Sequence, residues 1–220
     1  MPTRPSVSSE ALSELIGSGL SEVGLPVERG QIEALAGFSA RVAEWGERLN
    51  LTGYSQADAI ARRLVLGAGA LCARLPQLTS LNDLGSGAGF PGIPIAILRP
   101  ACRVHLVEAR ERRYHFLREV ARHLGLANLS VERSRIERAE PKPAAGAVAQ
   151  AVGPANQVLD WMLPWAEPRG WLILPASLES DLPSERPEVV EVEVRSYRVP
   201  LGGPHQRLWL ARRADASRGA

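Results

Sequence analysis

Apolar residues in the first third of the chain recur every three or four positions, which is the spacing of one helix face. Between positions 32 and 49 these residues are Ile32, Leu35, Phe38, Val42, Trp45 and Leu49. A second helical set, at positions 60, 64, 68 and 71, follows Ser55-Gln56-Ala57-Asp58, a sequence typical of a capping box. We therefore predict that residues 1–78 form a helical extension.

From position 81 onward, short apolar runs alternate with helical segments. We expect strands at residues 80–84, 103–108, 129–133, 147–150 and 171–174, with helices between them. This alternation is typical of a parallel sheet wrapped by helices on both faces. Two further strand-like runs, 189–196 and 206–212, flank a loop that contains Gly202, Gly203 and Pro204, and they predict an antiparallel hairpin. The predicted α/β core covers residues 79–213, and residues 214–220 form a tail.

The most informative segment of the core lies directly after its first strand. Asp83 closes the strand, and Gly85, Gly87 and Gly89 follow at alternate positions, with Ser86 and Phe90 among them. A turn without side chains lets a ligand lie against the backbone, its amides free to donate, and glycine tolerates the positive φ that such turns need. The segment therefore predicts the site of a nucleotide-type cofactor.

Two details of this segment distinguish between cofactors. The pattern Gly87-x-Gly89-x-x-Gly92 formally satisfies the dinucleotide fingerprint. However, Pro91 and Pro94 remove N–H donors that a pyrophosphate would need at the helix start. The carboxylate of Asp83 would repel pyrophosphate but suits the amine of S-adenosylmethionine. We predict S-adenosylmethionine, and a nicotinamide-dependent oxidoreductase remains the alternative.

Two later segments extend the predicted cofactor site. Glu108 ends the second strand, 23 residues after Gly85, where a carboxylate can accept the hydroxyls of a ribose. Both dinucleotide and methyl-donor sites use such an acid. After the third strand, Ile136 and Glu137 can flank an adenine ring and its amine, although Glu137 can equally be an ordinary surface charge.

Length and composition set broader limits. With 220 residues, of which 45% are hydrophobic, the chain can bury a full core in one domain. It contains no apolar run long enough to span a bilayer and no signal-peptide core, so we expect a cytoplasmic protein that does not associate with membranes. We also expect a monomer. Cys72 and Cys102 lack metal-binding spacing, and we predict neither a metal site nor a disulfide.

The basic residues are almost all arginines. The net charge is only +2, and Lys142 is the one lysine among 26 basic residues. Ten arginines lie between Arg99 and Arg138, and Arg112 and Arg113 come directly after the second strand. Guanidinium groups suit phosphate oxygens, so a nucleic-acid substrate is one interpretation. The other is a solvated helix face whose arginines pair with neighbouring glutamates.

The glycine segment, Asp83-Leu-Gly-Ser-Gly-Ala-Gly-Phe-Pro-Gly-Ile-Pro, closely resembles the signature of the glucose-inhibited division protein B family, bacterial 16S rRNA guanine-N7 methyltransferases. The resemblance implies a Rossmann-like methyltransferase fold that contacts S-adenosylmethionine through Gly85, Phe90, Ile136 and Glu137, with Glu108 near the ribose. It also implies 16S rRNA or the 30S subunit as the partner. Further matches follow in order along nearly the whole chain: Glu44-Trp45, Leu49-Asn50-Leu51-Thr52, Leu106-Val107-Glu108, Arg112-Arg113, Phe116-Leu117, Arg135-Ile136-Glu137 and Tyr197-Arg198-Val199-Pro200.

The chain departs from this family pattern at three places. Gln150 stands where the family has the arginine of a Ser-Arg-Ala sequence, and we expect it beside the cofactor. Arg63, followed by Leu66, stands at the family's histidine before an Asp-Ser pair, and Pro175 stands at its lysine. We expect Arg63, Arg112 and Arg113 to contact the substrate. The departures leave open a divergent paralogue that binds S-adenosylmethionine or RNA with altered substrate or no activity.

The implied reaction does not require a catalytic side chain. Guanine N7 carries an in-plane lone pair and no proton, so methyl transfer to it needs no general base. Alignment of the two reacting atoms alone can supply on the order of 7 to 11 kcal/mol in the best cases. The fourth strand is also not followed by the Asn-Pro-Pro-Tyr type of motif used for amino groups. We therefore predict direct in-line transfer.

Overall fold

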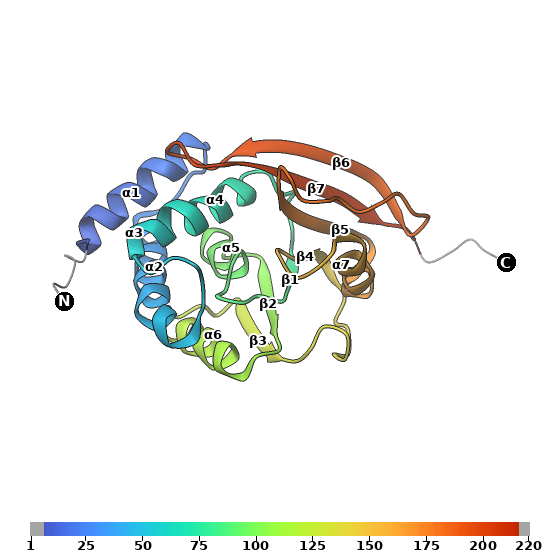
Figure 1. The fold of residues 1–220 in the computed structure, drawn as a ribbon, viewed down its shortest axis with the longest axis horizontal. Coiled ribbons are helices and arrows are strands. Elements are labelled where there is room, and N and C mark those ends of the chain that lie inside the picture. Colours follow the sequence, from blue (N-terminus) through green and yellow to red (C-terminus); the bar gives the residue numbers. More distant parts are fainter. Residues whose placement is uncertain (1–6, 216–220) are drawn as a thin grey trace.

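The computed structural model describes residues 7–215 and contains a seven-stranded sheet (Figure 1). The strand order is β3-β2-β1-β4-β5-β7-β6. The first five strands in the sequence run parallel, and β7 lies antiparallel between β5 and β6. The predicted C-terminal hairpin is therefore confirmed. The bounds are β1 (Ser80–Leu84), β2 (Arg103–Glu108), β3 (Leu129–Arg133), β4 (Ala144–Val148), β5 (Ala166–Ser177), β6 (Val189–Arg198) and β7 (His205–Arg213).

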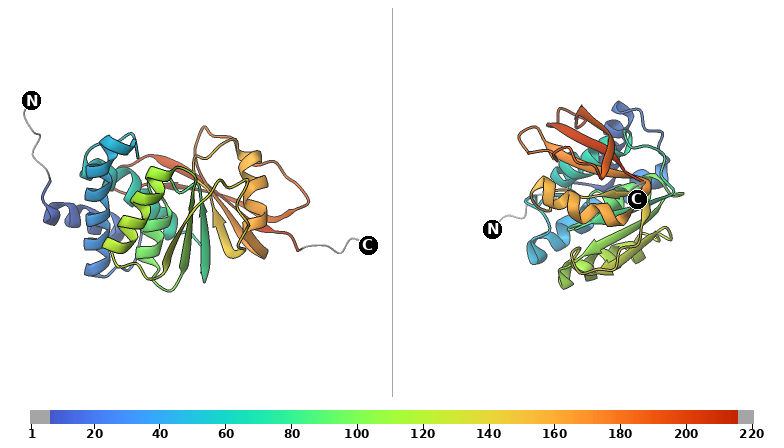
Figure 2. Two further views of the ribbon diagram at one scale, coloured as in Figure 1. Left: turned by 90° about the horizontal axis from the view of Figure 1, so that it is seen from below. Right: turned by 90° about the vertical axis from the view of Figure 1, so that its right-hand side faces the viewer.

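Helices cover both faces of this sheet, as the alternation predicts, but unequally. One face packs against the helices from the first half of the chain, and the other packs mainly against α7 and Trp165 (Figure 2, left). The bounds are α1 (Ser9–Glu22), α2 (Arg29–Leu49), α3 (Ala57–Ile60), α4 (Leu66–Cys72), α5 (Gly92–Leu98), α6 (Glu111–His123) and α7 (Ala155–Met162).

The N-terminal helices share one hydrophobic core with the sheet. Ile16 of α1, Phe38 of α2 and Leu106 of β2 are all buried in the same cluster. The predicted boundary at residue 78 falls between α4 and β1. Because residues on both sides of it belong to one buried cluster, the helical extension packs directly against the sheet. The turn of the β6–β7 hairpin also reaches α1, where Glu22 Oε2 accepts a hydrogen bond of 2.9 Å from the Leu201 amide.

The second predicted helix differs from its expected form. It begins at Ala57, but Gln56 precedes it without a side-chain cap bond, so the capping box predicted at Ser55 is wrong. The helix also changes to a π-helical turn at Ala61–Val65 before continuing as α4. π-helical turns are rare and occur often at functional sites, and this one carries Arg63.

Two strand predictions need correction. β4 spans Ala144–Val148 rather than residues 147–150, because its pairing with β5 begins at Ala144 and its pairing with both β1 and β5 ends at Val148. Residues 149–150 therefore lie beyond the strand, in the loop at its carboxyl end. β5 is longer than residues 171–174 because antiparallel pairing with β7 continues it to Ser177.

The connection from β3 to β4 crosses the amino-terminal half of the sheet. Asn82 Nδ2 donates to the carbonyls of Lys142 and Trp165 at 2.7 and 2.8 Å. The Lys142 ammonium pairs with Glu132 of β3.

The predicted tail at residues 214–220 lies mostly outside the described residues. No helix within residues 7–215 is both long and apolar enough to cross a membrane.

Candidate functional site

The glycine turn lies at the carboxyl end of β1, where β1 has β2 on one side and β4 on the other. In an open α/β sheet this reversal of strand order is where ligands bind. The φ angles of Gly85, Gly87 and Gly89 are 75°, 58° and 94°. All three lie in the left-handed region, which confirms the predicted need for glycine. A Cβ on Gly89 would meet Ile93 at 2.5 Å, so the missing side chain allows the turn to pack against α5. Gly89 lines neither of the two cavities described below.

The amides of this turn are mostly occupied, contrary to the expectation of free donors. Gly85 and Ser86 both donate to the Val107 carbonyl, and Gly89 donates to Ser86. Gly87 donates to Glu108 Oε2 at 2.9 Å. The turn folds onto the end of β2, and these bonds hold it there. The turn therefore allows a ligand to approach the backbone closely, but it does not offer a full set of unused N–H donors.

Asp83 lies beneath the turn rather than in a cavity. Its side chain is 1% exposed, and Oδ2 accepts a hydrogen bond of 2.9 Å from the Gly92 amide at the start of α5. Burial raises the pKa of this carboxyl to about 7, although the bond from Gly92 opposes the shift. Asp83 therefore connects β1 to the start of α5, and its side chain lines neither of the two cavities described below.

Glu108 has the position expected of a ribose acceptor. It is 5% exposed, at the carboxyl end of β2. Its two oxygens accept from different amides, Oε2 from Gly87 and Oε1 from Arg110 at 2.7 Å. These bonds fix the carboxylate in one orientation beside the turn. Each oxygen keeps a further lone pair for a ligand hydroxyl.

A cavity of about 310 Å³ adjoins Glu108, and we call it the acidic cavity after this carboxylate, although Arg110, Arg113 and Arg135 also line it. Ile136 and Glu137 line it from the loop after β3, as predicted, and Trp161 of α7 faces it as well. The remaining residues that line it are Gly85, Val107, Glu108, Ala109, Arg110, Arg113, Ser134, Arg135, Ala151 and Val152. Trp161 has no counterpart among the sequence predictions.

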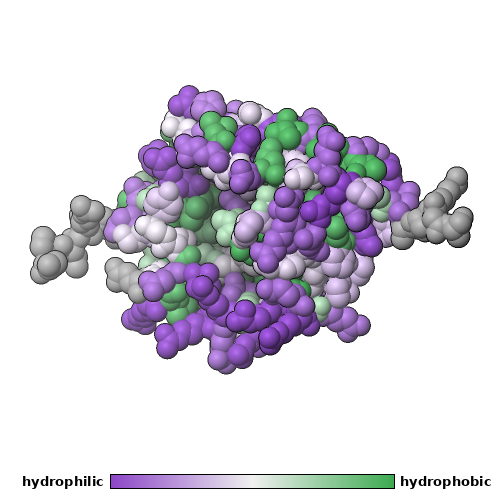
Figure 3. Space-filling model, turned by 45° about the vertical axis from the view of Figure 1, so that its right-hand side comes forward, coloured by the Kyte–Doolittle hydropathy of each residue, from purple (hydrophilic) through white to green (hydrophobic). Residues whose placement is uncertain are grey.

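A second cavity, of about 360 Å³, lies on the other side of the turn, and we call it the central cavity. The space-filling view shows a recess with pale and apolar residues inside a hydrophilic rim (Figure 3). The central cavity shares Gly85, Arg113 and Ala151 with the acidic cavity. It is lined by Leu51, Thr52, Gly53, Tyr54, Arg63, Leu64, Gly67, Ala68, Leu71, Gly85, Ser86, Gly87, Ala88, Phe90, Arg113, Gln150, Ala151, Pro175, Tyr197 and Gln206.

The three arginines predicted to contact a substrate do not lie together. Arg63 and Arg113 line the central cavity, whereas Arg112 is exposed on α6 and lines neither cavity. Arg113 donates to the Asn50 carbonyl at 2.7 Å, and within residues 7–215 its buried Nε has no partner. Arg113 therefore bridges α6 and the loop after α2, and it forms part of the wall between the cavities.

Several cavity residues escaped the sequence analysis. Tyr54 follows Thr52, whose hydroxyl bonds both the amide and the carbonyl of Tyr54 and so shapes the loop. Tyr197 belongs to the Tyr-Arg-Val-Pro segment, but nothing in the sequence places it at this site. Gln206 carries no sequence signal at all. These residues come from segments far apart in the chain, which only the hairpin pairing and the loop after α2 bring together.

Some known proteins resemble this chain in sequence, and others resemble it in fold. A family model described as rRNA small subunit methyltransferase G matches residues 31–207. Ribosomal RNA small subunit methyltransferase G of Sorangium cellulosum is 34% identical over 162 residues, covering 70% of this chain and 68% of that protein. The protein of the same name from Parvibaculum lavamentivorans is 33% identical over 204 residues, covering 82% and 90%.

Solved structures extend the comparison to the fold alone. A Klebsiella pneumoniae protein described as an O-methyltransferase superposes with a TM-score of 0.58 at 16% identity, over 94% of this chain and 99% of that one. Coclaurine N-methyltransferase bound to N-methylheliamine and SAH gives a TM-score of 0.54 at 17% identity, over 87% and 76%. The predicted Rossmann-like methyltransferase fold is thereby confirmed.

Proposed function

Because the chain belongs to the rRNA small subunit methyltransferase G family, we propose that it transfers the methyl group of S-adenosylmethionine to N7 of a guanine in 16S rRNA. The observation that carries the proposal is the pair of cavities that meet at Gly85, Arg113 and Ala151. The acidic cavity contains the carboxylate of Glu108, which is held by two backbone amides. The central cavity is lined by Arg63 and Arg113 together with apolar and aromatic side chains. Two ligands that meet end to end fit this arrangement.

The residues present fit S-adenosylmethionine. A Cβ on Gly87 would lie 3.7 Å from an Arg113 guanidinium nitrogen, so a larger residue would fill the space between turn and arginine. Glu108 is positioned to accept ribose hydroxyls, and Ile136 and Glu137 to flank an adenine. S-adenosylmethionine supplies an electrophilic methyl group on a positively charged sulfur.

The chain's own residues then act by holding the base. Guanine N7 attacks through its lone pair and has no proton to lose, so no side chain needs to act as a base. Arg63 and Arg113 supply positive charge around the central cavity, which suits the phosphates beside the target nucleotide. Tyr54 offers aromatic surface for stacking of the base, and Phe90, which the family resemblance assigns to S-adenosylmethionine, lines the same cavity. Alignment of N7 with the methyl group is the main contribution.

We further infer that the protein acts as a cytoplasmic monomer. A substrate in the small ribosomal subunit places the reaction in the cytoplasm. β6 lies at the edge of the sheet, and its register with β7 shifts between Val190 and Glu193. Such irregular edge strands disfavour pairing with the sheet of another copy.

The test is methylation of 30S subunits taken from a strain that lacks the gene. Purified protein and S-adenosylmethionine are added, and N7-methylguanosine in 16S rRNA is measured by mass spectrometry. We expect the modification to appear, and Arg63→Ala to slow it about tenfold through lost phosphate contact. Arg62→Ala is the matched control, because Arg62 is also exposed on the π-helical turn but lies outside the cavity. Absence of the modification would contradict the proposal and favour a divergent paralogue.

A further inference from the structure

Tyr197 and Gln206 form a cross-strand pair at the carboxyl edge of the sheet. The two residues are directly opposite each other in the antiparallel register of β6 and β7. The Tyr197 hydroxyl donates to Gln206 Oε1 at 2.7 Å. Tyr197 is 4% exposed, and burial raises the pKa of its phenol to about 12. The hydroxyl therefore keeps its proton at neutral pH and remains a donor.

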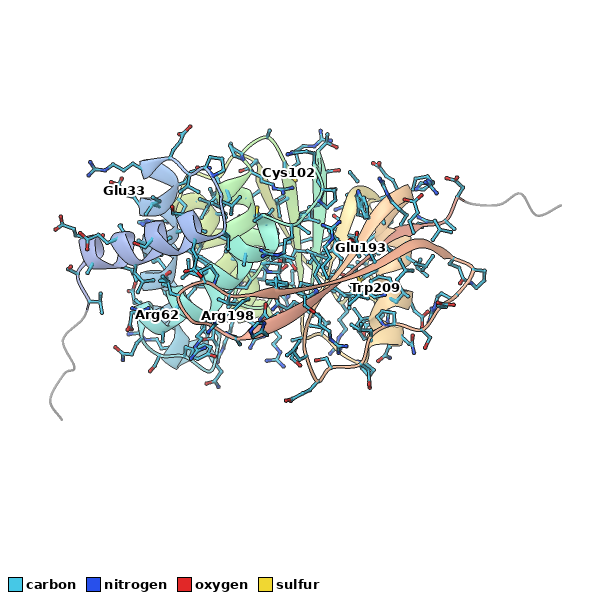
Figure 4. The ribbon with its side chains drawn as sticks, turned by 90° about the horizontal axis from the view of Figure 1, so that it is seen from above. Glu33, Arg62, Cys102, Glu193, Arg198 and Trp209 are labelled. Atoms are coloured by element: carbon cyan, nitrogen blue, oxygen red, sulfur yellow. The ribbon has the colours of Figure 1, made fainter. Side chains whose placement is uncertain are left out.

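The surroundings hold Tyr197 in one orientation. The guanidinium carbon of Arg74 lies 5.0 Å from the centre of the tyrosine ring. The neighbouring Arg198 lies near the hairpin turn, well away from Glu193 and Trp209 on the same hairpin (Figure 4). Arg198 Nε donates to the Gly203 carbonyl at 3.2 Å, which closes the turn beside Tyr197. The position of the phenol is therefore set by the hairpin and by the turn after α4 together.

This geometry leaves the nitrogen end of the Gln206 amide available. With Oε1 accepting from Tyr197, Nε2 carries two N–H donors, and it has no acceptor within residues 7–215. Gln206 lines the central cavity and also an adjoining cavity of about 390 Å³ beyond Gln150 and Pro175. Gln150 is the other amide in the central cavity, but within residues 7–215 no hydrogen bond from its side chain fixes its orientation. Of these two amides, Gln206 is the pre-oriented donor.

We propose that Gln206 is a specificity-determining residue whose Nε2 donates to O6 of the target guanine, with Tyr197 as the residue that positions it. The inference rests on the proposed function and names the contact that selects the base. Guanine O6 is an acceptor next to N7, and N7 must stay free for the methyl group. Adenine has an amino donor at the same place, so it would face the Gln206 donor without a bond.

The principal test replaces the donor with an acceptor of the same shape. Gln206→Glu and Gln206→Met are compared with the unmodified protein in single-turnover methylation of 30S subunits. We expect both changes to lower kcat/KM about tenfold while leaving S-adenosylmethionine affinity, measured by titration calorimetry, unchanged. Gln77→Glu, an exposed change before β1, is the matched control and should have no effect. Full activity in Gln206→Glu would overturn the inference.

Base selection is measured directly at the methylated position. This position is first located by mapping the N7-methylguanosine that the unmodified protein produces. 30S subunits with adenosine at that position serve as a competing substrate. We expect Gln206→Glu to reduce the preference for guanosine about tenfold, because a carboxylate accepts from the adenine amine. An unchanged preference would overturn the assignment to O6.

The role of Tyr197 is tested by a double-mutant cycle. Tyr197→Phe should lower kcat/KM severalfold in the unmodified background and have no further effect in the Gln206→Met background. Equal effects in both backgrounds would mean that Tyr197 serves only packing. If the unmodified protein itself yields no N7-methylguanosine, then the proposed function fails and this inference fails with it. A methylating protein whose Gln206 variants behave normally contradicts this inference alone.

Discussion

At the residue scale, the buried carboxyl of Asp83 connects the stability of the fold to the glycine turn. The carboxyl is buried between β1 and α5, and its usual pKa of 3.8 is raised to about 7. The protonated form is therefore favoured on folding. A group of this kind stabilises the native state most at low pH, and this contribution is lost as the pH rises from about 4 through 7.

The replacement Asp83→Asn should remove this pH dependence. Asparagine can still accept the bond from Gly92 but does not titrate. Relative to Asp83→Asn, the unmodified protein should lose about 3 kcal/mol of unfolding free energy between pH 5 and pH 8. Urea unfolding of both proteins at the two pH values measures the difference. Parallel pH profiles would show that the Asp83 carboxyl is not held in a raised-pKa site.

Gln150 is the residue-scale departure that bears most directly on activity. It lines the central cavity, where the family resemblance implies an arginine. A guanidinium makes charge-assisted bonds that are roughly twice as strong as those of an amide. If the chain is a weakened rRNA enzyme, Gln150→Arg should raise the single-turnover rate on 16S rRNA about fivefold. The exposed change Gln77→Arg should not. An equal or higher rate for the unmodified protein would show that Gln150 does not impair this chemistry.

At the element scale, α6 carries two adjacent arginines with different surroundings. Arg113 is directed to the cavity wall and bonds the Asn50 carbonyl, whereas Arg112 is exposed. Arg113 lines both the acidic and the central cavity, whereas Arg112 lines neither. The sequence predicts that both arginines contact the substrate, and replacing each one separately tests whether their roles differ.

The replacement Arg112→Ala should reduce the salt slope of RNA binding by about 1 while S-adenosylmethionine affinity stays the same. Arg113→Ala should weaken both. The control Arg29→Ala, at the exposed start of α2, should leave the slope unaltered. The measurement is RNA affinity across a range of salt concentrations. An unaltered slope in Arg112→Ala would mean that this arginine is only a solvated charge.

The sequence predicts some elements better than others for physical reasons. β1, β2 and β3 have the expected bounds, since each is a short apolar run closed by a turn or a charged residue. β5 exceeds its prediction because its last residues are stabilised by β7, which is distant in the sequence. The π-helical turn at Ala61–Val65 is invisible to a pattern based on 3.6 residues per turn.

At the scale of the whole molecule, ligand binding should add to stability. A ligand at 100 times its dissociation constant adds about 2.7 kcal/mol to the free energy of unfolding. We expect the demethylated cofactor, S-adenosylhomocysteine, to raise the unfolding temperature and NAD to leave it unchanged. Glu108→Ala should weaken cofactor binding by about 1.5 to 3 kcal/mol, whereas the exposed Glu140→Ala should not. A shift with NAD alone would favour the oxidoreductase alternative.

The candidate site was predictable where a motif lies within one continuous segment. Gly85, Gly87 and Glu108 are recognisable because the turn and the strand that hold them are adjacent in the fold and marked in the sequence. Tyr54 and Gln206 were not, because their position depends on the three-dimensional packing of the loop after α2 and on hairpin register. Asp83 lies away from its expected place, since its carboxyl accepts from Gly92 at the start of α5 and lines neither cavity.

Lys142, which pairs with Glu132, has a practical use because it is the single lysine of the chain. Apart from the terminal amine, Lys142 is the one primary amine in a chain whose other basic side chains are guanidinium or imidazole groups. It lines neither the acidic nor the central cavity, and 61% of its side chain is exposed. A fluorophore coupled through amine chemistry would therefore attach to one known side chain, once the more acidic terminal amine has been blocked. Energy transfer from that point to labelled 30S subunits would report docking while both cavities stay open.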